Sequence, residues 1–343
     1  MSKRKGLDLV ILAGGRGKRI SNLTNKIPKP LIKINGIHFL QYLINFYSKF
    51  NFKNIYILTG YKGEQFNKFD GEMSNFIPIK CLREKEKLDT GGALFQIKNI
   101  VNDNFILING DSYINYNFTR FIKKKLKNNQ IGRMLLVSNS NNKSNNKLAK
   151  LNIDKKGVVN FAGSFMNAGV YYLNKKIFKY LKLERISLEN KVMPELINRN
   201  LINGLITSDK LLDIGSYSSL KKAKYFLSKF QKNISIFLDR DGVINIDRKY
   251  VFNIDDFKFR KNVIKTFKIL NKKNINIFVV TNQAGIARGY FTENDFFKLS
   301  RHIKKVLAKK NIFINDVQYC PYHENGKIKK YKKKSGFRKP GNL

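Results

Sequence analysis

The sequence is poor in acidic residues, cysteine, proline and tryptophan. Its 343 residues include 24 Asp and Glu, 2 Cys, 6 Pro and no Trp. The two cysteines, Cys81 and Cys320, are too few for a disulfide framework. Long apolar runs are also absent near the N-terminus, where glycines interrupt the short stretch LDLVILA. This pattern predicts neither a secretory signal nor a membrane span, so we expect a cytoplasmic protein without a membrane partner.

The shortage of acidic residues leaves a large excess of positive charge. The chain has 67 Lys and Arg and a formal net charge of +43 at pH 7, which meets the first criterion for a nucleic-acid-binding protein. The lysines, however, are spread over nearly every segment and accompany asparagine and isoleucine, which indicates a general compositional bias. We expect no specific nucleic-acid partner, although a basic binding protein with a degenerate enzyme fold is the alternative from another class. In either case the positive field attracts phosphorylated substrates.

The apolar pattern indicates two α/β domains. Buried-strand runs alternate with amphipathic stretches, and this pattern starts afresh after a thin polar join at residues 231–233. A chain of this length can bury two cores. We therefore predict domains at residues 1–231 and 232–343, each a Rossmann-like three-layer fold. The polar, low-complexity residues 138–147 are predicted to form an exposed loop.

A glycine-rich loop follows the first predicted strand. It reads LAGGRGKRI (Leu12 to Ile20), and PKPLIKING (Pro28 to Gly36) comes soon after it. Glycines at such a place let the backbone approach phosphates closely, and free backbone N–H groups bind their oxygens. A plain strand–helix turn has the same glycines, so the loop alone does not decide the function.

Three later motifs favour a phosphate site. EKEKLDTGGAL (Glu84 to Leu94) is a second glycine turn that opens a helix. NGDS places Asp111 at the carboxyl end of a strand, where ligands bind in open α/β sheets. LLDIGS places Asp213 after another short strand. Two carboxylates that converge on a phosphate site are suited to Mg²⁺.

With these motifs in this order, residues Leu7 to Leu220 resemble the sugar-phosphate nucleotidyltransferases, in particular the heptose 1-phosphate guanylyltransferases. The resemblance implies a GT-A-like fold. It also implies in-line attack of a sugar 1-phosphate oxygen on the α-phosphate of a nucleoside triphosphate, with release of pyrophosphate. Such a transfer depends on positioning and charge neutralisation more than on a strong base.

The resemblance also assigns roles to individual residues. Nucleotide binding is assigned to Gly14, Gly15, Arg16, Gly17, Gly91 and Gly92. The remaining roles are phosphate neutralisation by Arg19 and Lys29, Mg²⁺ binding by Asp111 and Asp213, and sugar binding by Asn167 and Glu189. The sequence departs from the family pattern at Lys18, where threonine is common, and at Asp89, where glycine is common. An acidic side chain beside the base could alter the nucleotide preference.

A second candidate site lies in FLDRDGVIN (Phe237 to Asn245). Asp239 and Asp241 lie two residues apart after a predicted strand, so that one carboxylate could attack phosphorus while the other protonates the leaving oxygen and later activates water. An Asp-rich turn is the alternative for this motif alone. VVTNQAGIARGYF (Val279 to Phe291) follows the next strand, where Thr281 and Asn282 could donate hydrogen bonds to a phosphoryl group.

These motifs resemble the haloacid dehalogenase superfamily from Ile234 to Leu343. More narrowly they are similar to the D-glycero-D-manno-heptose 1,7-bisphosphate 7-phosphatases, although histidinol phosphatases share them. The resemblance implies an aspartyl-phosphate intermediate and Mg²⁺ held by Asp239 and Asp241. It assigns substrate binding to Thr281, Asn282, Arg338 and Lys339.

Two family features are missing from this second region. The zinc loop of those phosphatases is incomplete, because CPYH offers only Cys320 and a shifted His323, while Ser335 and Phe337 stand at the later cysteine positions. Two ligands cannot close a tetrahedral site, so structural zinc is not expected and Cys320 is predicted to be a small buried residue. The last motif, a strand with aspartates that complete the Mg²⁺ site, does not appear before the sequence ends. We therefore expect a truncated, impaired phosphatase whose incomplete sheet has an exposed edge.

The two resemblances support one another. A phosphatase that acts on a heptose bisphosphate leaves a heptose 1-phosphate, which a nucleotidyltransferase can activate. We predict a bifunctional enzyme that uses GTP and heptose phosphates and supplies lipopolysaccharide, capsule or S-layer glycans. The alternative is a nucleotidyltransferase for mannose, glucose or N-acetylmuramate 1-phosphate with a histidinol-phosphatase-like or inactive C-terminal domain. The sequence leaves the oligomeric state open.

Overall fold

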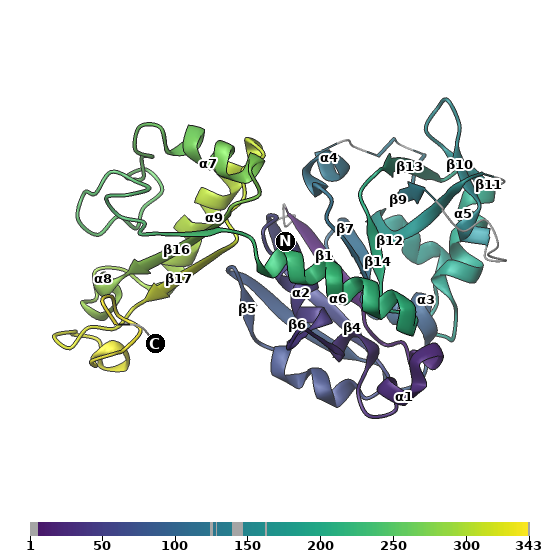
Figure 1. The fold of residues 1–343 in the computed structure, drawn as a ribbon, viewed down its shortest axis with the longest axis horizontal. Helices are drawn as coiled ribbons and strands as arrows, with labels where there is room; N and C mark the ends of the chain where they lie inside the picture. The colour runs from purple at the N-terminus through teal and green to yellow at the C-terminus, as the bar shows by residue number, and fades with distance from the viewer. Residues whose placement is uncertain (1–5, 124–125, 128, 139–146, 162, 342–343) are drawn as a thin grey trace. The chain divides into compact units, whose positions relative to one another are not determined.

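The computed structural model describes residues 6–123, 126–127, 129–138, 147–161 and 163–341 (Figure 1). Most of the predicted loop over residues 138–147 therefore lies outside the described residues. The chain divides into two compact units. The N-terminal unit contains Met1–Tyr47, Phe52–Met73 and Ile77–Lys229, and the C-terminal unit contains Ser48–Asn51, Ser74–Phe76 and Phe230–Leu343.

A ten-stranded sheet forms the centre of the N-terminal unit. Strand β1 pairs in parallel with β4 on one side and with β7 on the other, β4 pairs in parallel with β6, and β12 runs antiparallel to β7. Along its main path the sheet has the order β11 (Val159–Phe161), β10 (Leu151–Ile153), β12 (Phe165–Asn174), β7 (Asn104–Asn109), β1 (Leu7–Leu12), β4 (Phe52–Thr59), β6 (Ile77–Arg83), β5 (Met73–Ser74). Beyond this path, β9 (Gly132–Ser138) pairs with β12 and with β13 (Ile202–Thr207).

Two small ribbons, several α-helices and short 3-10 and π-helical turns are also described in the N-terminal unit. The ribbons are β2 (Lys33–Ile34) with β3 (Ile37–His38), and β8 (Ser112–Ile114) with β14 (Leu211–Asp213). The α-helices are α1 (Ser21–Thr24), α2 (Phe39–Tyr47), α3 (Asp89–Phe95), α4 (Phe118–Lys123), α5 (Met193–Asn198) and α6 (Tyr217–Gln231). The second ribbon pairs Asp213 with Ser112, two residues that lie far apart in the sequence.

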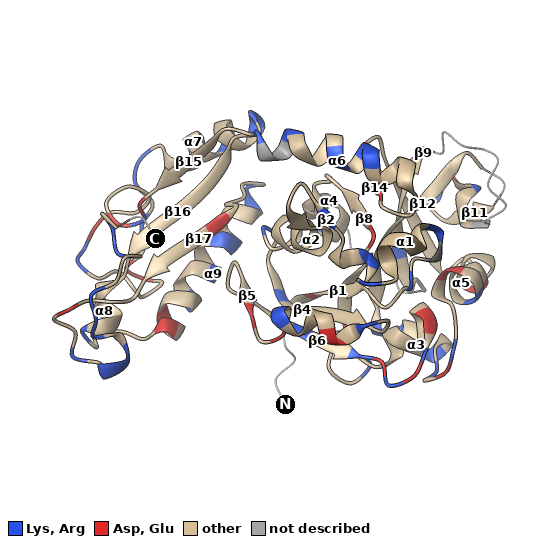
Figure 2. Ribbon diagram, turned by 60° about the horizontal axis from the view of Figure 1, so that its bottom comes forward, with Lys and Arg blue, Asp and Glu red and all other residues tan. Residues whose placement is uncertain are grey.

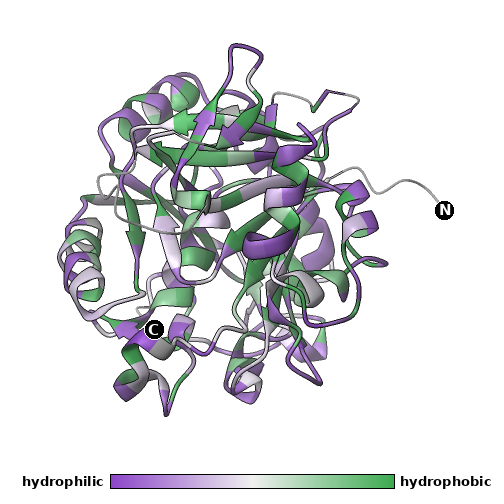
Figure 3. Cartoon of the chain, turned by 90° about the vertical axis from the view of Figure 1, so that its right-hand side faces the viewer, coloured by the Kyte–Doolittle hydropathy of each residue, from purple (hydrophilic) through white to green (hydrophobic). Residues whose placement is uncertain are grey.

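The central strands are apolar on both faces. Residues Leu9 to Leu12 of β1 and Phe105 to Ile108 of β7 are buried. Such continuous apolar runs are typical of parallel strands covered on both sides. Figure 3 shows green hydrophobic residues along strands in the interior and purple hydrophilic residues on many of the outer helices and loops. The carboxyl ends of the parallel strands then open onto the candidate site.

The C-terminal unit contains a three-stranded parallel sheet. Its order is β15 (Ser235–Leu238), β16 (Asn276–Asn282), β17 (Asp316–Cys320), and its helices are α7 (Val263–Lys272), α8 (Ala284–Ala287) and α9 (Glu293–Lys309). Thr292 and Asp295 form a capping box at the start of α9, which satisfies backbone N–H groups there. Cys320 is buried at the end of β17, as predicted.

The predicted α/β class is confirmed, because both units combine parallel-rich sheets with helices. Among the described residues, no helix is both long enough and apolar enough to cross a bilayer. Figure 2 shows basic residues on the helices and loops of both units rather than on one element. This distribution agrees with lysine as a general surface residue.

Candidate active sites

The glycine loop of the N-terminal unit leaves the end of β1 and is fixed to the end of β4. The N–H of Ala13 donates to the carbonyl of Leu58 (2.8 Å), and the N–H of Tyr61 donates to the carbonyl of Gly14 (3.2 Å). Gly17 has a φ of +63°, and a Cβ there would lie 2.9 Å from Thr24 Cγ2. By contrast, a Cβ on Gly15 would have nothing within 4 Å. The loop is therefore held in place while its tip stays open to a ligand.

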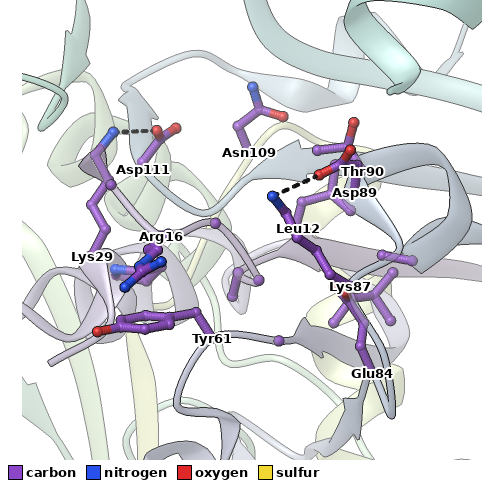
Figure 4. A pocket seen from close by; sticks show the side chains of 18 of the residues that line it. Leu12, Arg16, Lys29, Tyr61, Glu84, Lys87, Asp89, Thr90, Asn109 and Asp111 are labelled. Atoms are coloured by element: carbon purple, nitrogen blue, oxygen red, sulfur yellow. Dashed lines mark hydrogen bonds and ion pairs between the residues drawn. The ribbon is translucent and has the colours of Figure 1, made fainter. Parts of the chain in front are cut away.

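This loop forms one wall of a cavity of about 850 Å³ (Figure 4). Side chains from the ends of several parallel strands also line it, where ligands bind in open α/β sheets. Seven of the residues predicted from the sequence line this cavity: Gly14, Gly15, Arg16, Gly17, Lys29, Asp111 and Glu189. Five other predicted residues are not part of this lining: Arg19, Gly91, Gly92, Asn167 and Asp213.

Lys29 and Asp111 meet at the cavity. The Lys29 Nζ lies 2.5 Å from Asp111 Oδ2, and in Figure 4 the two side chains point toward each other. A Cβ on Gly215 would lie 2.8 Å from both Arg19 Nη2 and Asp213 Oδ1, and 3.3 Å from Lys29 Nζ. The two basic side chains predicted to neutralise phosphate are thus gathered with the two aspartates.

The β8–β14 ribbon brings the two aspartates together. Asp213 lies opposite Ser112, and the N–H of Ile214 donates to the carbonyl of Asp111 (3.1 Å). The Asp213 Oδ1 accepts hydrogen bonds from the N–H of Gly215 (2.7 Å) and the hydroxyl of Ser219 (3.0 Å). Among the described residues, no group of three or more His, Cys, Asp or Glu could hold a metal ion. Two carboxylates nevertheless fit Mg²⁺, which commonly takes one or two carboxylates and completes its shell with phosphate oxygens and water.

Glu189 and Asn167, the two predicted sugar-binding residues, lie in different surroundings. Glu189 lines the cavity from the first turn of the π-helix η6 (Leu188–Val192), and its Oε2 accepts a hydrogen bond from the Thr90 hydroxyl (2.5 Å). Burial raises the pKa of Glu189. The Asn167 amide instead binds within β12, because its Nδ2 donates to the Tyr171 hydroxyl (2.5 Å) and its Oδ1 accepts from the N–H of Gly169 (2.9 Å).

Glu84 also lines the cavity, although its sequence motif predicted no role for this residue. Its Oε2 accepts a hydrogen bond from the N–H of Leu88 (2.9 Å). Its Oε1 lies against Gly14, so close that a Cβ added to Gly14 would be only 2.6 Å from it. Burial raises the pKa of this carboxyl. The only sequence signal was its place at the start of EKEK, just before the second glycine turn. The structure thus puts an acidic acceptor directly beside the glycine loop.

In the C-terminal unit, Asp239 is paired with Lys339. The Asp239 Oδ2 lies 2.8 Å from Lys339 Nζ, which also donates to the carbonyl of Val280 (2.7 Å). The Asn282 side chain holds the backbone of Lys339 at both its N–H (3.0 Å) and its carbonyl (3.2 Å). The structure therefore brings together three predicted residues, Asp239, Asn282 and Lys339. The amide of Asn282, which was predicted to bind a phosphoryl group, here binds the backbone of Lys339.

Asp241 is held by its neighbours. Arg240, which is 2% exposed, donates from Nε and Nη2 to both carboxylate oxygens at 2.9–3.2 Å. The Gln283 Nε2 donates to Asp241 Oδ2 and to the hydroxyl of Thr281, both at 2.9 Å. The carboxylates of Asp241 and Asp239 are thus both engaged by basic side chains, as the carboxylate of Asp111 is by Lys29. The role of Asp239 and Asp241 as Mg²⁺ ligands stays a prediction.

Comparison with known proteins agrees with the arrangement in the N-terminal unit. Residues 9–229 match the family model described as nucleotidyl transferase. The crystal structure of HddC from Yersinia pseudotuberculosis is 26% identical, covers 64% of this chain and 99% of its own, and gives a TM-score of 0.54. A second structure of HddC, complexed with GMP-PN, gives a TM-score of 0.53 over the same shares. The inositol-1-phosphate CTP transferase from T. maritima, at 17% identity over 67% of this chain and 98% of its own, shares the fold with a TM-score of 0.55.

Curated relatives of a second kind match a shorter stretch of the chain. The D-glycero-alpha-D-manno-heptose-1,7-bisphosphate 7-phosphatase of Campylobacter jejuni is 46% identical over 101 residues, or 29% of this chain and 59% of the relative. The D-glycero-beta-D-manno-heptose-1,7-bisphosphate 7-phosphatase of Haemophilus influenzae is 45% identical over 108 residues, or 32% of this chain and 58% of the relative. The chain thus spans less than two thirds of the length of these relatives.

Both resemblances drawn from the sequence are confirmed by these matches. The family model covers more than half of the chain. Within the matched region, the glycine loop, Lys29 and Asp111 line one cavity. The protein therefore belongs to the nucleotidyl transferase family, and its chain also contains a segment related to the heptose bisphosphate phosphatases.

Proposed function

We propose that the N-terminal unit transfers GMP from GTP to D-glycero-α-D-manno-heptose 1-phosphate and releases pyrophosphate. The observation that carries this proposal is the shared cavity, in which the glycine loop, the Lys29–Asp111 pair and Glu189 line one space. The similarity to HddC, one structure of which is complexed with GMP-PN, supports a guanine nucleotide. The related phosphatases, which by name act on a heptose bisphosphate, support a heptose substrate.

In this mechanism a phosphate oxygen of the sugar 1-phosphate attacks the α-phosphorus, and the bond from that phosphorus to the β-phosphate bridging oxygen breaks. The open N–H groups around Gly15 bind phosphate oxygens, and Lys29 and Arg19 offset their negative charge. Asp111 and Asp213 would hold Mg²⁺, which stabilises the charge on the transferred phosphate and the leaving pyrophosphate. Because the attacking oxygen is already anionic, no strong base is needed and alignment of the substrates dominates.

Glu84 supplies a physical reason for guanine. Guanine has N–H donors at N1 and at its 2-amino group, and an ionised carboxylate is an acceptor only. The Glu84 carboxylate lies against Gly14 in the wall of the cavity, where it can accept hydrogen bonds from a base held by the loop. Adenine has no donor at N1 and no 2-amino group, so this contact disfavours ATP.

We propose for the C-terminal unit the hydrolysis of the 7-phosphate of D-glycero-D-manno-heptose 1,7-bisphosphate. Asp239 attacks phosphorus, the bond from phosphorus to the C7 oxygen breaks, and that oxygen takes a proton from Asp241. Water then attacks the aspartyl phosphate and releases phosphate, returning a proton to Asp241. Lys339 offsets the charge of Asp239 and the phosphoryl group, and the product is the acceptor of the first reaction. The resulting nucleotide sugar would serve lipopolysaccharide, capsule or S-layer synthesis.

Pyrophosphate release over a panel of substrates tests the transferase proposal. The panel pairs five nucleoside triphosphates with heptose, mannose, glucose and N-acetylmuramate 1-phosphates, and GTP with the heptose phosphate should give the highest kcat/KM. Asp111→Asn should abolish this release without affecting phosphate release from the bisphosphate. Turnover of a hexose phosphate with none of the heptose phosphate would contradict the proposed substrate.

A further inference from the structure

The turn that follows Glu84 is attached along its length to the segment that carries Glu189. The N–H of Ile186 donates to the carbonyl of Leu88 (3.1 Å), and the N–H of Gly91 donates to the carbonyl of Ile186 (2.8 Å). A Cβ on Gly92 would lie only 2.1 Å from the carbonyl oxygen of Glu184. The double glycine therefore lets the two backbones approach each other.

Two side chains of the turn, Asp89 and Thr90, also contact the segment that carries Glu189. Asp89 adopts a φ of +53°, which favours glycine, and pairs with Arg185 Nε at 2.9 Å. Thr90, the next residue, makes two hydrogen bonds through one hydroxyl. It accepts from the N–H of Leu188 (2.8 Å) and donates to Glu189 Oε2 (2.5 Å).

These contacts connect two walls of one cavity. Asp89 and Thr90 line it from the turn that follows Glu84, and Glu189 lines it from a segment about a hundred residues later. The Thr90 hydroxyl fixes the direction of the Glu189 carboxylate, because it bonds both to that carboxylate and to the backbone one residue before it. The orientation of Glu189 thus depends on a residue outside its own segment.

We propose that Thr90 is a positioning residue, which aims the Glu189 carboxylate at the sugar and links the sugar side of the cavity to its nucleotide side. This inference rests on the proposed function. A hydrogen bond to a charged group stabilises it substantially, so removal of the hydroxyl leaves the carboxylate free to turn away. The effect falls on sugar binding, because the glycine loop and Lys29 do not depend on this hydroxyl.

The test compares Thr90→Val with Thr90→Ser in the full chain, with GTP and D-glycero-α-D-manno-heptose 1-phosphate as substrates. Thr90→Val retains the shape of threonine but loses the hydroxyl, so it should raise KM for the sugar phosphate about tenfold or more. KM for GTP should change less than about threefold, which is a size that small indirect effects of one substitution commonly reach. Thr90→Ser should restore the sugar KM, because serine keeps the hydroxyl.

Thr207 offers a matched control in the same unit. Its hydroxyl also donates to a carboxylate, Asp209 Oδ2 (2.5 Å), and accepts from a backbone N–H, that of Asp209 (3.1 Å), but neither residue lines the cavity. Thr207→Val should leave both KM values at the wild-type level. Equal changes in both KM values for Thr90→Val, no change, or a failure of serine to rescue would overturn the inference.

A second measurement does not depend on activity. In the unliganded protein, Thr90→Val should speed hydrogen exchange at the Leu188 amide, which loses its acceptor, while the Ile186 amide keeps its bond to Leu88. Unchanged exchange at Leu188 would refute the connection itself. If the wild-type protein releases no pyrophosphate with any sugar phosphate, the proposed function fails, and the exchange measurement still decides whether Thr90 fixes this segment.

Discussion

Replacing Glu84 with glutamine should weaken the preference for GTP while the fold is retained. Glutamine keeps one oxygen, which can still accept the hydrogen bond from Leu88, and has nearly the same volume beside Gly14. The substitution removes the charge and turns one acceptor into a donor that faces the donors of guanine. A hydrogen bond to a charged group contributes about 1.5–3 kcal/mol, and about 1.4 kcal/mol is a factor of ten. The kcat/KM for GTP should therefore fall roughly tenfold to a hundredfold.

Inosine triphosphate makes this experiment specific, because it lacks only the 2-amino group of GTP. The wild-type enzyme should prefer GTP to ITP by about tenfold in pyrophosphate release, as expected for one donor to a carboxylate. Glu84→Gln should reduce this ratio toward one. Glu86→Gln is the matched control, because Glu86 lies two residues away and also lines the cavity. Equal losses for GTP and ITP in Glu84→Gln, or a wild-type enzyme that does not distinguish them, would refute the role given to Glu84.

Three further predictions concern the remaining chemistry and packing. Asp239→Asn should abolish phosphate release from the heptose bisphosphate and leave nucleotidyl transfer intact; equal release by wild type and variant would show that Asp239 is not the nucleophile. Gly92→Ala should destabilise the protein by about 1–3 kcal/mol through overpacking and so lower the melting temperature. Gly15→Ala, where an added Cβ meets nothing within 4 Å, should leave the melting temperature unchanged. An unaltered melting temperature for Gly92→Ala would contradict the packing argument. EDTA should abolish pyrophosphate release and added Mg²⁺ should restore it, whereas full activity in EDTA would exclude a role for Asp111 and Asp213 as metal ligands.

Much of the nucleotide side of the cavity could be predicted from the sequence, because its parts are local. A glycine loop after an apolar strand and an aspartate at the end of another strand must come near one edge of a parallel sheet. Lys29 and Asp111 accordingly meet at 2.5 Å. The α/β class followed in the same way from the alternation of apolar runs with amphipathic stretches.

Contacts between distant segments could not be predicted in this way. Gly91 and Gly92 have a sequence pattern typical of a ligand turn, yet they pack against residues 184–186, whose position depends on the whole fold. The role of Thr90 was missed for the same reason, since its partner Glu189 lies 99 positions away in the sequence. Asn282 likewise has the spacing of a phosphate donor, but its amide holds the backbone of Lys339. Local patterns therefore predicted residues that line the cavity, while the partners of individual side chains came from tertiary structure.

The most direct test of the central claim is a single reaction that contains the full chain, D-glycero-α-D-manno-heptose 1,7-bisphosphate, GTP and Mg²⁺. The account predicts GDP-heptose, with phosphate and pyrophosphate formed in equal amounts, and with heptose 1-phosphate as the intermediate. Asp239→Asn should stop the sequence at the bisphosphate, and added heptose 1-phosphate should restore GDP-heptose formation in that variant. Failure to form a nucleotide sugar from heptose 1-phosphate, under conditions where a hexose 1-phosphate is converted, would contradict the account.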